Sequence, residues 1–72
     1  GFLLCNLTAD VIIEIFPEIH RVMRPKGIAV FSGILISQGA AVRRAAEALG
    51  FTMLQEKTRG EWCALVMRQN GP

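Results

Sequence analysis

The 72-residue sequence lacks several features that mark whole classes of protein. It contains no tyrosine, and charged residues make up only 19% of it. No apolar run approaches the roughly 18 residues that span a bilayer, and residues 1–5 lack the basic and long apolar regions of a signal peptide. No basic run stands out in a chain whose net charge is +2. The sequence therefore predicts no membrane segment and no direct binding of nucleic acid.

Cysteine and histidine, which supply most metal sites and many nucleophiles, are also scarce. Cys5 and Cys63 lie in apolar runs outside any CxxC or CxxH pattern, which predicts buried, reduced thiols in a cytoplasmic protein. His20 lies away from the apolar stripe of its segment and has no partner acid, which favours a solvated side chain over a catalytic base. We therefore predict no catalytic residue and no metal site.

Hydrophobic residues make up 51% of the chain, and their spacing predicts alternating strands and helices. Residues 2–5 form an uninterrupted apolar run that fits a strand buried on both faces. A helix capped by Thr8 is predicted to follow and to end before residue 24. Pro17 is expected to kink this helix or to divide it into two short ones. The inner face of the helix is expected to consist of Ile12, Ile15, Phe16, Ile19, Val22 and Met23.

A second strand over residues 28–34 and a second helix are predicted next. Ser37 is the expected cap of this helix, which runs to about Leu49, and Gly50 stands where a left-handed residue commonly ends a helix. Small alanine side chains allow the helix to lie close to a sheet. Its inner face is expected to consist of Val42, Ala45, Ala46 and Leu49, with Arg43, Arg44 and Glu47 in solvent.

The last two segments are predicted to form an antiparallel hairpin. Apolar and polar side chains alternate over residues 51–57, which is typical of a strand at a sheet edge. Residues 61–68 are apolar on both faces and are expected inside the sheet, beside residues 28–34. The side chains expected on one face of the edge strand are Phe51, Met53 and Gln55. The predicted fold class is therefore α/β, in the order β-α-β-α-β-β, with the last strand inserted antiparallel.

Five short motifs follow one another along nearly the whole chain. They are Asn6-Leu7-Thr8-Ala9-Asp10, Arg24-Pro25-Lys26-Gly27, Ser32-Gly33-Ile34, Ala48-Leu49-Gly50-Phe51 and Gly60-Glu61-Trp62-Cys63-Ala64-Leu65-Val66. In this order they resemble the closing part of the ribosomal protein L11 methyltransferases, which are Rossmann-like (class I) S-adenosylmethionine-dependent enzymes. The second motif departs from the family's Lys-Pro-Gly-Gly turn, since a lysine replaces one glycine. The resemblance implies that residues 1–72 are a single partial domain, the C-terminal third of a methyltransferase catalytic domain.

The resemblance also implies an activity for the full-length protein. Enzymes of this family methylate amino groups of a ribosomal protein, on lysine side chains or at the amino terminus, with S-adenosylmethionine as cofactor. They bind the cofactor mainly through a glycine-rich loop after the first strand and an acidic residue at the end of the second. Neither feature is present in residues 1–72. We therefore expect this chain alone to bind no S-adenosylmethionine and to transfer no methyl group.

Asn6 is the principal candidate for contact with cofactor or substrate. It follows the first strand, and ligands of doubly wound folds lie beyond the carboxyl ends of parallel strands. Its amide carbonyl could accept a hydrogen bond from the cofactor or from the substrate amine and so orient the amine. The resemblance implies the same role, with the backbone of Leu7 and the side chain of Thr8 nearby. The alternative is that Asn6 and Thr8 only turn the strand into the helix.

Four other residues have a structural interpretation beside a functional one. Ser32 and Gly33 are expected either to shape the floor of the cofactor cleft or, in the case of Gly33, to form a bulge or a tight contact. Trp62 is expected to be a packing anchor rather than a stacking platform. Cys5 precedes Asn6, but core packing is the favoured interpretation for its side chain.

Two other functions are compatible with the sequence. The strand over residues 2–5 lacks a neighbour on one side, so the chain could be a non-enzymatic interaction module that forms a homodimer through Phe2–Cys5. A different class I methyltransferase is the other alternative. Enzymes that methylate amino groups of glutamine or DNA often carry Asn-Pro-Pro-Tyr after this strand, where this chain has Asn6-Leu7-Thr8-Ala9.

Overall fold

The computed structural model describes residues 2–71 of the chain, without the side chains of Phe2 and Cys5. Within this range the chain alternates strands and helices in the predicted order. The elements are β1 (Phe2–Asn6), α1 (Ala9–Val22), β2 (Ile28–Leu35), α2 (Ile36–Ala48), β3 (Phe51–Arg59) and β4 (Trp62–Gln69). The predicted α/β class and the predicted order of elements are therefore confirmed.

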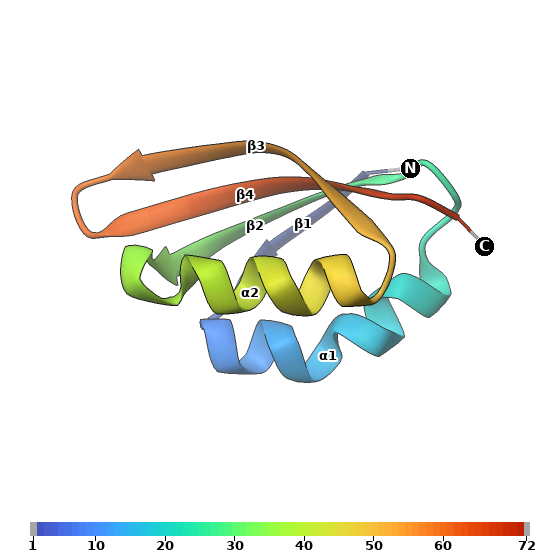
Figure 1. Ribbon diagram of the computed structural model, residues 1–72, viewed down its shortest axis with the longest axis horizontal. Helices are drawn as coiled ribbons and strands as arrows, with labels where there is room; N and C mark the ends of the chain where they lie inside the picture. The colour runs from blue at the N-terminus through green and yellow to red at the C-terminus, as the bar shows by residue number, and fades with distance from the viewer. Residues whose placement is uncertain (1, 72) are drawn as a thin grey trace.

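The four strands form one sheet in the order β1-β2-β4-β3. β1 pairs with β2 in parallel, whereas β4 is inserted antiparallel between β2 and β3, as predicted. Figure 1 shows both helices on the same side of this sheet, so that the molecule has two layers. Within residues 2–71, the opposite face of the sheet is covered by no helix. We call this opposite face the open face.

The core lies between the sheet and the two helices and is centred on three aromatic rings. The centroid of the Phe16 ring in α1 is 5.1 Å from that of Phe31 in β2 and 5.7 Å from that of Phe51 in β3. Aromatic contacts of this kind stabilise a core beyond the burial of their area. They connect α1 to a central strand and to an edge strand. The other buried hydrophobic residues are Ala9, Ile12, Ile19, Ala29, Ile34, Val42, Ala46, Cys63, Leu65 and Met67.

α1 is one continuous helix with Pro17 inside it, so the expectation of two short helices is wrong. Ile12 before the proline and Ile19 after it are both buried, and this shared packing holds the two halves in one helix. Val22 does not belong to the inner face, because it is the last helical residue and its side chain is 63% exposed. Thr8 occupies the N-cap position, but its side chain forms no capping hydrogen bond.

The carboxyl end of α1 is held by Gln69, a buried polar residue at the end of β4. Its side-chain Nε2 donates hydrogen bonds to the carbonyl oxygens of His20 and Met23, each at 3.2 Å. The last carbonyl groups of a helix have no partner within the helix, and here the Gln69 side chain supplies a donor. Gln69 therefore ties the end of α1 to β4.

α2 begins at Ile36, directly after β2, and its N-cap residue is Leu35. The prediction that Ser37 caps this helix is therefore wrong. The N–H of Ile36 donates to the carbonyl oxygen of Glu61 at 2.9 Å. The turn between β3 and β4 thus supplies an acceptor for the first N–H of the helix. The prediction for the other end is confirmed, since the helix ends at Ala48 and Gly50 has a left-handed φ of 93°.

A bulge in β3 changes which of its side chains face the helices. Met53 pairs with Met67 and Gln55 pairs with Val66, so that Leu54 is an extra residue in β3. Because side chains alternate along a strand, one extra residue reverses the faces of all those that follow. The prediction that Gln55 shares the face of Met53 is therefore wrong.

Beyond this bulge, charges of opposite sign lie on opposite faces of β3. Glu56 pairs in register with buried Leu65 on the helix side, and its Oε1 is 3.7 Å from a guanidinium nitrogen of Arg43 on α2. Lys57 and Arg59 follow on the open face and are exposed. Arg43 is exposed as predicted, and it also forms an ion pair with Glu56 of β3.

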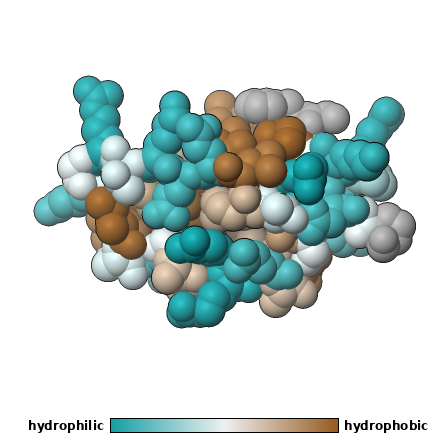
Figure 2. All heavy atoms as spheres, turned by 45° about the horizontal axis from the view of Figure 1, so that its top comes forward, coloured by the Kyte–Doolittle hydropathy of each residue, from teal (hydrophilic) through white to brown (hydrophobic). Residues whose placement is uncertain are grey.

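The open face is apolar in its middle. Val30 and Val66 are half-buried there, Leu4 is 67% exposed, and Trp62 is 53% exposed. Figure 2, in which this side of the molecule is tilted toward the viewer, shows hydrophobic surface in the middle and hydrophilic side chains projecting at both ends. The prediction that Trp62 is a packing anchor is wrong. Side chains alternate along β4, so that Cys63 faces the helices and Trp62 lies on the open face.

Candidate functional site

Asn6, Leu7 and Thr8 connect the end of β1 to the start of α1, and all three are exposed. β1 and β2 are parallel, so their carboxyl ends lie at the same edge of the sheet, where Asn6 pairs with Ser32. Ligands of doubly wound folds bind beyond this edge. The three predicted binding residues therefore stand where a ligand can reach them.

Gly33, in a bulge of β2, leaves the space in which the Asn6 side chain lies. The pairing of β2 with β4 shifts between Phe31 and Ile34, and Gly33 has a left-handed φ of 80°. A Cβ atom at position 33 would be 2.5 Å from Oδ1 of Asn6 and 3.4 Å from the carbonyl oxygen of Leu7. The first of these distances is shorter than real Cβ contacts. The amide of Asn6 therefore rests on backbone that only glycine leaves bare.

Neither Asn6 nor Thr8 uses its side chain to turn β1 into α1. The Thr8 hydroxyl forms no capping bond, and within residues 2–71 the Asn6 amide has no hydrogen-bond partner. The backbone makes the turn instead, since the carbonyl oxygen of Thr8 accepts the N–H of Ile12 at 3.0 Å. The Asn6 amide is thus available to a ligand, and the turn does not require it.

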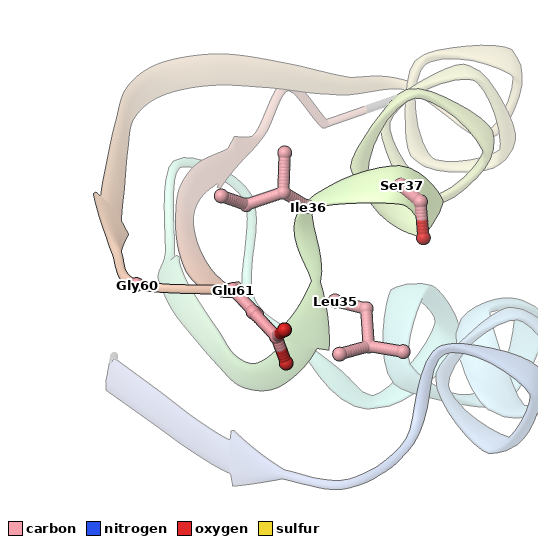
Figure 3. A pocket seen from close by; sticks show the side chains of 5 residues that line it. All are labelled: Leu35, Ile36, Ser37, Gly60 and Glu61. Atoms are coloured by element: carbon pink, nitrogen blue, oxygen red, sulfur yellow. The ribbon is translucent and has the colours of Figure 1, made fainter.

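Two open hollows lie on this side of the molecule. The larger has a volume of about 490 Å³ and is lined by Leu35, Ile36, Ser37, Gly60 and Glu61. Figure 3 shows the Glu61 carboxylate directed toward Leu35, while Ile36 and Ser37 point in other directions. Polar groups do not converge in this hollow, which therefore carries no arrangement suited to catalysis.

The smaller hollow has a volume of about 310 Å³ and lies among β2, β3 and β4. It is lined by Ser32, Gly33, Lys57, Thr58, Arg59, Trp62, Cys63 and Ala64. Gly33 is also the residue against which the Asn6 amide lies. The smaller hollow therefore adjoins the candidate site directly.

Cys63 is buried, with a free thiol, as the sequence predicts. Burial raises the pKa of the Cys63 thiol above its ordinary value, and the negative charge of Glu56 raises it further. A raised thiol pKa keeps the sulfur protonated at neutral pH, which makes it a poor nucleophile. Cys63 is therefore a packing residue. The prediction for Cys5 concerns a side chain outside the described ones.

The prediction that the His20 side chain is solvated is wrong. That side chain is half-buried, and its ring centroid is 5.6 Å from that of Phe51 in an edge-to-face contact. A Cβ atom at Gly50 would lie 3.3 Å from its Nε2, so the imidazole packs against the junction of α2 and β3. β3 runs in the same direction as β2, so the start of β3 lies at the amino ends of these strands. Asn6 lies at the opposite, carboxyl ends. His20 takes no part in the candidate site.

The side chains and helices of residues 2–71 bear on two further possibilities, a metal site and a membrane-spanning helix. No group of three or more histidine, cysteine, aspartate or glutamate side chains there could hold a metal ion. Neither α1 nor α2 is long and apolar enough to cross a membrane.

Comparison with known proteins shows the family of the chain. The family model described as "Ribosomal protein L11 methyltransferase (PrmA)" matches residues 1–70. The chain belongs to the ribosomal protein L11 methyltransferase family. Among the L11 methyltransferases, that of Desulforapulum autotrophicum is 49% identical over 61 residues, which are 85% of this chain and 20% of that protein. The L11 methyltransferase of Thermosynechococcus vestitus is 41% identical over 64 residues, or 89% of this chain and 21% of that protein.

A solved structure shows the same fold. The crystal structure of the ribosomal protein L11 methylase from Lactobacillus delbrueckii subsp. bulgaricus superposes with a TM-score of 0.90 at 20% sequence identity. The match covers 96% of this chain and 36% of that one. The chain thus spans about a fifth of the length of the two curated L11 methyltransferases named above.

Proposed function

We propose that this chain is part of an S-adenosylmethionine-dependent methyltransferase that acts in the cytoplasm on amino groups of a ribosomal protein. Within that enzyme, the chain forms the part that holds the methyl acceptor. In this proposal residues 1–72 are the C-terminal third of the catalytic domain. The observation that carries it is the exposed Asn6 amide, which has no hydrogen-bond partner within residues 2–71 and lies against Gly33 at the carboxyl edge of parallel strands. Membership of the family and the names of the relatives support the reaction and the substrate.

Asn6 and Leu7 are suited to hold an amine in place. Oδ1 of Asn6 and the carbonyl oxygen of Leu7 lie 2.5 Å and 3.4 Å from the position of a Cβ atom on Gly33, so both oxygens border one small region. Two such acceptors fix two N–H groups of an amine and thereby direct its lone pair, which is a positioning effect. Both acceptors are neutral. A carboxylate in place of the amide would favour the protonated amine, which has no lone pair to react.

The cofactor of this reaction supplies a methyl group on a sulfonium sulfur. The described residues can hold the methyl acceptor, but they do not provide the groups that bind the cofactor. β1 and β2 end at Asn6 and Leu35, so neither strand brings an acid that could bind ribose hydroxyls. β2 runs straight into α2 and leaves no glycine-rich loop there. Cofactor binding therefore requires parts of the enzyme beyond this segment.

The proposed activity is tested by incubating the full-length protein that contains this chain with S-adenosylmethionine and ribosomal protein L11. Mass spectrometry of the acceptor is expected to show added mass in steps of one methyl group, located at amino groups. An acceptor that gains no methyl group, or gains one only on oxygen or ring nitrogen, would overturn the proposal.

Residues 1–72 alone are expected not to bind S-adenosylmethionine. The reason is that the segment lacks both the glycine-rich loop and the ribose-binding acid. Titration calorimetry of the isolated chain should give no heat of binding under conditions in which the full-length protein binds the cofactor. Micromolar affinity of the isolated chain would show that this expectation is wrong.

A second function, a self-associating module, is favoured by a difference between the two edge strands. The edge strand β3 carries a bulge at Leu54 and the charged residues Glu56, Lys57 and Arg59, which discourage pairing with another chain. The edge strand β1 carries neither a bulge nor a charge, and its residue Leu4 is 67% exposed. β1 of an isolated chain is therefore the edge on which a second copy would pair.

The isolated chain is accordingly expected to form a symmetric dimer through β1 at micromolar concentration. Sedimentation should then report roughly twice the 7.9 kDa mass of one chain. Leu4→Lys places a charge on this edge and should restore the monomer, whereas Leu54→Lys on the other edge strand should leave the dimer intact. A monomeric wild-type chain, or a dimer insensitive to Leu4→Lys, would rule out this interface.

A further inference from the structure

Two cations stand side by side on the open face next to the candidate site. The bulge at Leu54 turns Lys57 and Arg59 to this face, opposite Ala64 and Trp62 of β4. Neither cation forms an ion pair within residues 2–71. Both line the smaller hollow, together with the half-exposed indole of Trp62.

Acidic side chains are absent from the lining of this hollow. The chain has six acidic residues, none of which lies on an open-face position of a strand. They are Asp10, Glu14, Glu18 and Glu47 on the helices, Glu56 on the helix side of β3, and Glu61 in the turn that lines the other hollow. The hollow therefore presents two positive charges that the described part of the chain does not neutralise.

The hollow is also partly apolar, which narrows the choice of ligand. Its lining includes Trp62, Ala64 and Gly33, which carry no charge and offer apolar surface. Such a lining suits a carboxylate on a methylene stem better than a fully polar anion, because the stem packs on the apolar part. An arginine guanidinium binds a carboxylate through two parallel hydrogen bonds, and a lysine adds a second positive charge.

We propose that this hollow binds an acidic side chain of the acceptor protein, close to the amine that is methylated. The inference rests on the proposed function, because it needs an acceptor held at Asn6. Gly33 connects the two parts of the site, since it contacts the Asn6 amide on one side and lines the hollow on the other. Asn6 and Leu7 would bind the amine, while Lys57 and Arg59 select a neighbouring carboxylate.

The test uses two fluorescent peptides that differ only in one residue beside a lysine, glutamate in one and glutamine in the other. With the full-length protein, the glutamate peptide is expected to bind and to be methylated about fivefold better at low ionic strength. This preference should shrink as salt is added. The double variant Lys57→Gln/Arg59→Gln should lose the preference.

Arg68→Gln is the matched control, because Arg68 is exposed on the same face but belongs to the far end of β4 and does not line the hollow. This variant should keep the preference for the glutamate peptide. Equal binding of both peptides by the wild type, or an equal loss in Arg68→Gln, would overturn the inference. If the peptides bind with the expected preference but are never methylated, the carboxylate site stands and the proposed function fails.

Discussion

Asn6→Ala in the full-length enzyme is expected to lower the rate of methyl transfer about 100-fold, the loss that follows when a reacting group is misplaced. The Asn6 amide is exposed and has no hydrogen-bond partner within residues 2–71, so the folded state gains little from it. The free energy of unfolding should therefore change by less than about 0.5 kcal/mol, as for other surface substitutions. Turnover of an amine substrate and chemical denaturation measure the two quantities on the same sample.

Two variants separate this role from a merely structural one. Val22→Ala shortens an exposed side chain at the far end of α1, and it should leave turnover near the wild-type level. Asn6→Asp keeps the shape of the side chain but adds a negative charge that stabilises the protonated amine. The pH–rate profile of Asn6→Asp should therefore shift to higher pH. Near-normal turnover of Asn6→Ala would contradict the assigned role.

Gly33→Ala is expected to reduce turnover to a similar extent, although position 33 need not touch the amine. The added methyl group would lie 2.5 Å from Oδ1 of Asn6, so the amide must leave its position. The left-handed φ of 80° should also cost about 1–2 kcal/mol of stability for a residue with a side chain. Gly33→Ala thus combines a loss of positioning with backbone strain.

Gly60→Ala isolates the strain from the loss of positioning. Gly60 has a left-handed φ of 59°, and a Cβ atom there would meet nothing within 4 Å. This variant should lose a similar amount of stability yet keep its turnover. In an Asn6→Ala background, Gly33→Ala should lower turnover no further, because both substitutions remove the same contact. Additive losses would show that Gly33 acts by another route.

The arrangement of the elements could be predicted from the sequence because local signals agree with one another. Apolar side chains at three- and four-residue steps mark α1, and two apolar segments joined by a short turn mark the hairpin of β3 and β4. Gly50 marks the end of α2 through a backbone conformation that other residues avoid. Each of these signals involves residues that are close in the sequence.

The predictions that failed depend on residues distant in the sequence. Leu54 becomes an extra residue in β3 only through its pairing with β4, so alternation along β3 alone put Gln55 on the wrong face. Trp62 follows the same logic, since the helix-facing positions of β4 are set by α1 and α2. His20 is half-buried because Phe51, from another element, reaches its ring.

The candidate site was predictable in part for the same reason. Asn6 could be proposed because it ends a strand, and strand ends hold ligands in this class of fold. The contact between Asn6 and Gly33 joins two strands and had no signal beyond an unexplained glycine. The placement of Lys57 and Arg59 on the open face, near Trp62, could not be predicted either, because it depends on the bulge and on the register of the hairpin.

The parallel pairing of β1 with β2 has a consequence for the order in which the molecule assembles. β3 and β4 are joined by a two-residue turn and can pair early, whereas β1 can pair with β2 only after the whole of α1 has been looped between them. Closing a long loop costs chain entropy before any contact offsets it, so non-local pairings form late. Asn6 meets Gly33 only through this late pairing. The amine-binding groups are therefore expected to come together after the hairpin, so that a chain in which only the hairpin has formed presents none of them.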